Sequence, residues 1–182
     1  MEIYIALALG IVILLALIGL FNSLVRRRNT VRNAWSDIDV QLKRRYDLIP
    51  NIVSVVKGYM QHERSVLEDV TKARTAALSA HTPLEKEQPE YALAGALKSL
   101  FAVAENYPDL KASVNFQQLQ EQLSFLENDI QSARRYYNAA VREFNTAIQT
   151  FPSFLLAGSM GFSQEPFFQA DEQERKNVNV TM

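Results

Sequence analysis

The uncharged segment at the amino end constrains this chain more than any other feature. From Ile3 to Val25 the sequence reads IYIALALGIVILLALIGLFNSLV, and none of these 23 residues is charged. As a helix the segment is about 34 Å long, enough to cross a bilayer core of about 30 Å. The stretch before it carries no positive charge, and no A-x-A cleavage site follows it. The pattern therefore favours an uncleaved transmembrane anchor over a cleaved signal peptide.

Positive charge is concentrated directly after this segment. Residues 26–45 carry seven basic and two acidic side chains, whereas residues 46–182 carry 12 basic and 17 acidic ones. Arg26, Arg27, Arg28 and Arg32 flank the apolar segment, and such residues resist translocation. We therefore expect a single-pass protein of the inner (plasma) membrane, with its amino end outside and its body in the cytoplasm. The same arginines lie close enough to attract anionic lipid, so the bilayer is one expected partner.

Several classes of function lack the residues they need. Nucleic-acid binders carry positive charge over the whole domain, and here it is confined to one short stretch. The chain has no cysteine, hence no disulfide and no thiolate site. His62 and Glu63 begin like the zinc motif H-E-x-x-H, but position 66 is Val66, and His81 is the only other histidine. We expect no metal, no cofactor, no nucleic-acid partner and no enzymatic activity.

Apolar residues recur at helical spacing over most of the remaining chain, so residues 30–151 are predicted to be helical. A first stripe comprises Val31, Trp35, Ile38, Leu42, Arg45, Ile49, Ile52, Val56 and Tyr59, and continues through Glu63, Val66, Val70, Ala73 and Ala77. Pro89 is expected to open a second helix that runs to about Glu105. A third stripe repeats every seven residues: Phe116, Leu123, Ile130, Tyr137, Phe144 and Phe151. The sequence predicts an all-α fold, an N-terminal transmembrane helix followed by an up-and-down bundle of long antiparallel helices.

Three regions follow from this pattern. Residues 1–28 form the anchor and its basic flank, residues 29–151 the helical bundle, and residues 152–182 a carboxy-terminal tail that is partly flexible. Phe162, Phe167 and Phe168 are too apolar for a free tail, so they either dock on the bundle or await a partner. The final stretch, residues 170–182, is expected to be solvated.

Two residues interrupt the first stripe and leave alternatives open. In one interpretation the stripe drifts off the core face here, and Arg45 and Glu63 are exposed to solvent. In the other, each meets an opposite charge on a neighbouring helix. The carboxylates available to Arg45 are then Glu105, Glu127 and Asp129, and the cations available to Glu63 are Arg134, Arg135 and Lys98. In a further alternative, Arg44 and Arg45 are exposed together as a docking patch.

Pro50 also has two interpretations. It either kinks one long helix or separates two bundle helices. The stripe keeps its phase across Pro50, which favours the kink. Polar groups gather around this proline and around a second proline, Pro108. The full set of candidate structural or interaction residues is Arg44, Arg45, Tyr46, Asp47, Pro50, Asn51, Glu63, Glu105, Tyr107, Pro108, Glu127, Arg134 and Asn138.

Three stretches resemble a known family. LKRRYDLIPNIV, AENYPDLKASVNFQQLQEQL and ENDIQSARRYYNAAVREFNTAIQTFP, in this order and followed by GFSQEPFF, are similar to the LemA family of bacterial membrane-anchored helical proteins. The resemblance covers nearly the whole chain. It implies one amino-terminal membrane helix, with its amino end outside, that carries a cytoplasmic helical bundle. It implies no reaction.

The sequence thus favours a non-enzymatic, membrane-tethered scaffold or adaptor that binds an unidentified membrane or cytoplasmic protein. One alternative is a ligand-binding or enzymatic bundle that uses polar groups near Arg45, Tyr46 and Tyr107. A second alternative is a structural coiled coil that associates with itself, since long heptad stretches favour pairing.

The arginine flank predicts the topology of the chain. Alkaline phosphatase fused after Met182 is active only outside the cytoplasm and should give no signal, because Arg26 to Arg28 keep the body inside. A β-galactosidase fusion at the same position, the matched control, should be active. Strong phosphatase activity together with an inactive galactosidase fusion would contradict the orientation.

Overall fold

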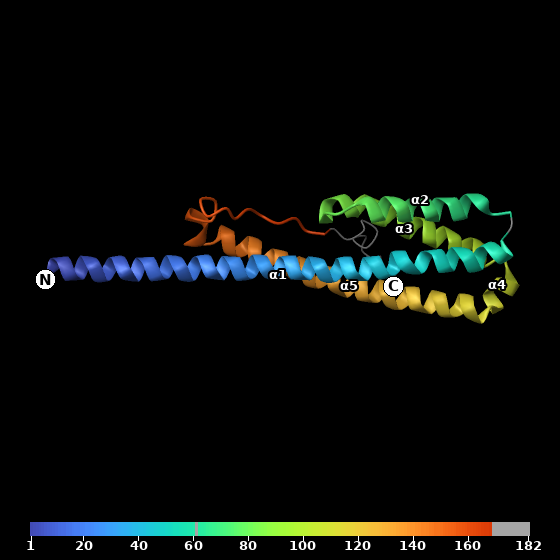
Figure 1. Ribbon diagram of the computed structural model, residues 1–182, viewed down its shortest axis with the longest axis horizontal. Helices are drawn as coiled ribbons and strands as arrows, with labels where there is room; N and C mark the ends of the chain where they lie inside the picture. Colours follow the sequence, from blue (N-terminus) through green and yellow to red (C-terminus); the bar gives the residue numbers. More distant parts are fainter. Residues whose placement is uncertain (61, 169–182) are drawn as a thin grey trace, which may run out of the picture. The chain divides into compact units, whose positions relative to one another are not determined.

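The predicted all-α fold is confirmed by the computed structural model, which describes residues 1–60 and 62–168. Within these residues the chain forms helices and turns and no strands. Figure 1 shows the helices in order: α1 (Glu2–Tyr59), α2 (Arg64–Ser79), α3 (Pro83–Ala104), α4 (Pro108–Ala112) and α5 (Val114–Gln149), followed by a 3-10 turn, η1 (Ser153–Leu155). The stretch expected to be solvated, residues 170–182, lies outside the described residues.

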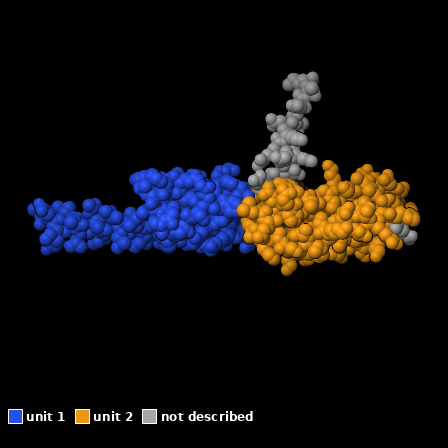
Figure 2. Space-filling view, turned by 90° about the horizontal axis from the view of Figure 1, so that it is seen from above, with its two compact units in different colours: residues 1–36, 135–167 blue, residues 37–134, 168–182 orange. Residues whose placement is uncertain are grey.

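The described chain divides into two compact units, coloured separately in Figure 2. Unit 1 comprises residues 1–36 and 135–167, and so holds the first part of α1 and the last part of α5. Unit 2 comprises residues 37–134 with Phe168, and holds the rest of α1 and α5 together with α2, α3 and α4.

Unit 2 is an up-and-down bundle with a continuous apolar core. Ile38 and Leu42 of α1, Leu100 of α3 and Ile130 of α5 are fully buried, and Val70 of α2 joins them. Short connections make successive helices antiparallel. Thr82 and Glu85 form a capping box at the start of α3, in which the threonine hydroxyl accepts from the Glu85 amide and the Glu85 carboxylate accepts from the Thr82 amide.

In unit 1, α1 and α5 run antiparallel. Trp35 packs against Tyr137, with ring centroids 5.7 Å apart, and further along the pair Arg27 lies 3.5 Å from Glu143. The predicted heptad line is buried from Phe116 through Phe144. Phe151, which shares the seven-residue spacing, is 78% exposed, because α5 ends at Gln149, two residues before it.

The first part of α1 is long and apolar enough to cross a membrane. No residue of its most apolar window is buried inside the protein. Length, composition and exposure together indicate a membrane anchor.

Three helix boundaries bear on the sequence-based expectations. α1 continues through Pro50, as the kink interpretation requires. The first stripe does not continue unbroken to Ala77, because α1 ends at Tyr59. The four residues at positions 61–64 are polar, so the sequence offers no apolar side chain to bury there. α3 begins at Pro83 and passes through Pro89, since the capping box starts the helix six residues earlier than expected.

Candidate functional site

A buried cluster of charged side chains surrounds Arg45 in unit 2. The side chain of Arg45 is only 1% exposed. Its Nη1 donates to Oε1 of Glu127 on α5 at 2.7 Å, and its Nη2 donates to Oε2 of Glu90 on α3. Glu127 is one of the three carboxylates that the sequence offered to Arg45, whereas Glu90 was not among them. Arg45 therefore joins α1 to two other helices at once.

Glu90 is the acceptor at the centre of this cluster. It is 3% exposed and receives hydrogen bonds from Arg45, from the hydroxyl of Tyr46, and from Nη2 of Arg134 at 3.3 Å. A buried carboxylate without such partners would be strongly disfavoured. The three donors come from α1 and α5, so they hold α3 against both helices.

Lys86 extends the cluster by one helical turn of α3. This lysine is 4% exposed, and its Nζ lies 3.3 Å from Oδ1 of Asp39 and 5.3 Å from the centroid of the Tyr46 ring. Three cations (Arg45, Lys86, Arg134) therefore face three carboxylates (Asp39, Glu90, Glu127), and the formal charge of the cluster is balanced.

The protonation equilibria of the cluster follow from burial and from this pairing. Burial acts to lower the pKa of Arg45, but the carboxylates of Glu90 and Glu127 outweigh it, and the pKa is raised. Burial, and then the adjacent Glu90 carboxylate, raise the pKa of the Tyr46 hydroxyl. Burial lowers the pKa of Arg134, with Glu90 opposing the change. At neutral pH both arginines therefore stay charged and the Tyr46 hydroxyl stays neutral.

The backbone next to the cluster explains how α1 tolerates Pro50. Proline has no amide hydrogen, so the carbonyl of Tyr46, four residues earlier, loses its helical donor. Nε of Arg74, on α2, donates to this carbonyl at 2.7 Å. A side chain of a second helix thus replaces the missing backbone bond, and α1 continues.

A second polar group, around Tyr107, is separate from the cluster. The Tyr107 hydroxyl donates to Oε1 of Glu63 at 3.5 Å. Glu63 stands at the start of α2, and Arg134, one of the cations expected to pair with it, instead donates to Glu90. Glu90 and the end of α3 are 14 residues, or about 21 Å, apart along the helix. The structure therefore keeps Tyr107 away from Arg45 and Tyr46. The ligand-binding alternative requires the polar groups of these three residues to lie together.

Two other candidates near the end of α3 take structural positions. Glu105 is the exposed C-cap of α3 and is not a partner of Arg45. Pro108 is exposed and opens the short helix α4, with Tyr107 as its N-cap.

A shallow groove lies between α1 and α5 in unit 2. Its volume is about 470 Å³, and it is lined by Arg44, Asp47, Leu48, Asn51, Gln122, Phe125 and Leu126. Arg44 is exposed, and Phe125 is 63% exposed. Because Arg45 is buried, the two arginines do not form an exposed patch together, and that alternative is wrong. Arg44 instead shares the groove with Asp47 and Asn51.

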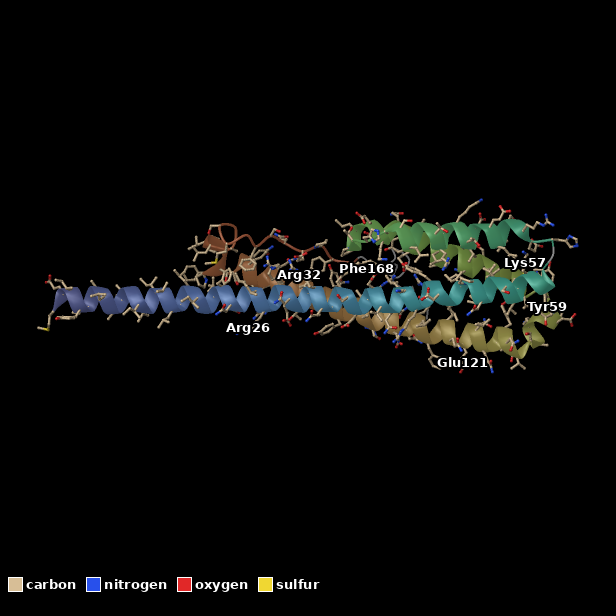
Figure 3. The ribbon with its side chains drawn as sticks, viewed as in Figure 1. Arg26, Arg32, Lys57, Tyr59, Glu121 and Phe168 are labelled. Carbon is tan, nitrogen blue, oxygen red and sulfur yellow. The ribbon has the colours of Figure 1, made fainter. Side chains whose placement is uncertain are left out.

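The remaining candidates lie in unit 1. Figure 3 shows Arg26 and Arg32 on the part of α1 that follows the apolar segment, and both are exposed. Arg27 pairs with Glu143, and the Arg28 guanidinium lies over the Phe162 ring, 4.8 Å from its centroid. Asn138 is half-buried on α5.

The described part of the tail docks on α5. The side-chain amide of Asn145 donates to the carbonyl of Glu165 and accepts from its amide, each at 2.9 Å. The Tyr137 hydroxyl donates to the carbonyl of Pro166 at 2.8 Å, and Phe168, in unit 2, is buried with its ring 4.7 Å from the Arg134 guanidinium carbon. Of the two options for the phenylalanines, docking holds for Phe162 and Phe168, whereas Phe167 is 44% exposed.

Sequence reasoning missed Glu90, Lys86 and Arg74, and for two of them a signal existed. The buried residues of α3 are Lys86, Glu90, Leu93, Leu97, Leu100 and Ala104, which alternate steps of four and three. Glu90 and Lys86 thus interrupt an apolar stripe just as Arg45 does in α1. Arg74 carries no such signal, because its role depends on which carbonyl lies opposite.

Across residues 1–60 and 62–168, no group of three or more histidine, aspartate or glutamate side chains is arranged to hold a metal ion.

Comparison with known proteins places these features in a family context. Residues 34–182 match the family model described as LemA family. A protein from Metamycoplasma hominis named Protein LemA is 31% identical over 168 residues, which cover 90% of this chain and 75% of the relative. Two proteins of Paramagnetospirillum magneticum, named Magnetosome protein MamQ 1 and MamQ 2, are each 25% identical over 195 residues, covering 89% of this chain and 72% of each relative.

The burial of Arg45 predicts an asymmetry between two adjacent arginines. Arg45→Met leaves the Glu90 carboxylate buried with fewer partners, and losing one member of such a pair costs about 3–5 kcal/mol. Arg44→Met removes an exposed charge and should change the free energy of unfolding by less than about 0.5 kcal/mol. Urea unfolding of the full chain in detergent micelles, followed by circular dichroism, measures both. Equal effects of the two substitutions would contradict the assignment.

Proposed function

The chain belongs to the LemA family, and we propose that it is a non-enzymatic, membrane-tethered helical scaffold whose body lies in the cytoplasm and binds a protein partner. The observation that carries this proposal is the contrast within unit 2. Its buried charges are paired with one another, while an aromatic and an arginine side chain line an open groove.

The anchor and its flank support the membrane part of the proposal. The apolar part of α1 has the length and composition to cross a bilayer, and Arg26, Arg27 and Arg28 follow it immediately. Lysine and arginine next to a membrane helix remain on the cytoplasmic side. These residues support a topology with the amino end outside and residues 29–182 inside.

The closed charge cluster argues against a ligand or a substrate at Arg45 and Tyr46. These residues are 1% and 2% exposed, and the two Nη atoms of Arg45 and the hydroxyl of Tyr46 already bond Glu90 or Glu127. A ligand would have to displace these ion pairs and would leave charges buried without partners. The cluster therefore serves to hold the helices in register.

The groove between α1 and α5 has the composition of a protein-docking site. Phe125 offers a large exposed apolar surface, with Leu48 and Leu126 beside it. Arg44, Asp47 and Asn51 provide polar groups along the same groove. Aromatic and arginine side chains contribute most of the affinity in protein interfaces, usually with polar groups at the rim.

Site-specific photocrosslinking in membranes tests this proposal. A photoreactive amino acid at Phe125 of the full chain should give a discrete adduct, since a docked partner would contact that side chain. The same amino acid at Leu84, which is 62% exposed on α3, is the matched control and should give none. Arg44→Glu in the Phe125 variant should abolish the adduct.

The outcome also separates the alternatives. An adduct of this chain with itself would favour the self-associating coiled coil. No adduct at Phe125, or equal adducts at Phe125 and Leu84, would contradict the groove as the docking site.

A further inference from the structure

Unit 1 contains a second uncharged segment besides the apolar part of α1. No residue from Phe144 to Gln164 is charged, and this stretch includes the end of α5 and the whole of η1. We call residues 150–162 the apolar turn. Its side chains Phe151, Phe154 and Leu155 are 78%, 54% and 61% exposed, so no other described part of the protein covers them.

The apolar turn packs beside the apolar part of α1 (Figure 1). The Phe162 ring lies 5.7 Å from the ring of Phe21 and 6.3 Å from that of Phe144. From the Arg27–Glu143 pair, α5 continues to Gln149, or about 9 Å further along the antiparallel α1. This reaches the level of Phe21, four residues inside the uncharged segment that ends at Val25.

The uncovered apolar stretch of α1 is too short to cross a bilayer core by itself, so the core extends to the level of Phe21. Side chains up to Ala16 are exposed, and the protein begins to cover α1 at Leu17. The uncovered stretch from Glu2 to Ala16 is only about 22 Å long, whereas a bilayer core of about 30 Å needs about 20 residues. A core that begins at Ile3 therefore ends near Asn22, alongside the apolar turn.

Much of the backbone of the apolar turn is hydrogen-bonded within the turn itself. The amides of Phe154, Ala157 and Phe162 donate to carbonyls of the turn at 2.9, 2.7 and 2.9 Å, and those of Leu155, Leu156, Met160 and Gly161 do so at 3.0–3.3 Å. Gly161 has a φ of 77°, which allows the chain to fold back so that the Phe162 amide reaches the Ala157 carbonyl. Internal bonding of these amides lowers the cost of moving this part of the turn out of bulk water into the interfacial region of a leaflet.

We propose that the apolar turn is a second membrane-contacting element, which places Phe151, Phe154 and Leu155 in the lipid of the leaflet where α1 leaves the bilayer. The occupant of this surface is lipid because the surface is continuous with the exposed apolar part of α1 and carries no charge. Apolar side chains of interfacial elements reach about 5–10 Å into a leaflet, which fits a turn at the level of Phe21.

The charged residues mark where this surface ends. The Arg27–Glu143 pair and the Arg28 guanidinium over Phe162 lie on the side of the apolar turn away from the anchor's amino end. Arginines at this level would meet lipid phosphates. The inference rests on the membrane anchoring in the proposed function and adds a second contact that orients unit 1 at the membrane.

Single-cysteine labelling tests the inference directly, because the chain has no cysteine of its own. Phe154→Cys in the full chain is labelled with the dye NBD and reconstituted in phosphatidylcholine–phosphatidylglycerol vesicles. We expect blue-shifted emission, loss of intensity with lipids that are spin-labelled near the headgroup, and protection from aqueous iodide. Leu155→Cys, the second variant, should behave alike, and circular dichroism checks that both remain folded.

Two controls separate this inference from the anchoring itself. Leu14→Cys, on the exposed apolar part of α1, should be quenched by lipids that are spin-labelled deep in the acyl chain. Ser36→Cys, exposed on α1 beyond the arginines, should be quenched by iodide.

Quenching by lipid at position 14 without quenching at 154 and 155 overturns the inference and leaves the anchor intact. No lipid quenching at position 14 overturns both. Protection from iodide at 154 without lipid quenching means that a second copy covers the turn, which also overturns the inference.

Discussion

The bundle of unit 2 depends on the ion pairs that the Arg45 guanidinium makes. This arginine lies on the core stripe of α1 and bonds Glu90 of α3 and Glu127 of α5. A buried ion pair of this kind adds little net stability compared with a well-packed apolar core, but breaking it is costly. Its consequence is specificity: any slip of α3 or α5 along α1 would leave a buried charge without its partner.

Tyr46 and Pro50 provide two more contacts of α1 with its neighbours, both within about one turn of Arg45. The Tyr46 hydroxyl bonds Glu90 on α3, and its carbonyl, left without a helical donor by Pro50, accepts from Arg74 on α2. An apparent defect of the helix thus becomes a point of attachment for α2. Residues 45–50 of α1 thus bond three neighbouring helices, and the groove lined by Arg44 and Phe125 lies beside them.

Local periodicity explains what the sequence revealed and what it concealed. The uncharged run from Ile3 to Val25 and the heptad line through Ile130 predicted the anchor and the bundle, because each depends on neighbours along the chain. The same reasoning placed Arg45 on the core stripe and named Glu127 as a possible partner. Glu90 interrupts an equivalent stripe and was open to the same argument.

The remaining features depend on contacts across the fold. Nothing in the sequence around Arg74 indicates that it replaces the amide missing at Pro50, since this requires knowing that α2 lies beside Tyr46. Asn145 occupies a polar line of α5, yet it is buried because the tail returns and pairs with it through Glu165. The exposure of Phe151 follows from the end of α5 at Gln149, which a heptad pattern does not specify.

The central claim is that Arg45 and Glu90 stabilise each other and thereby hold α1 against α3. A double-mutant cycle with Arg45→Met, Glu90→Leu and the double variant measures this coupling in the full chain. Each single variant leaves a buried charge with one partner fewer, so the double variant should lose far less stability than the two single losses combined. Coupled buried pairs deviate from additivity by about 0.5–3 kcal/mol. Losses that add to within about 0.3 kcal/mol would show two independent side chains and contradict the account.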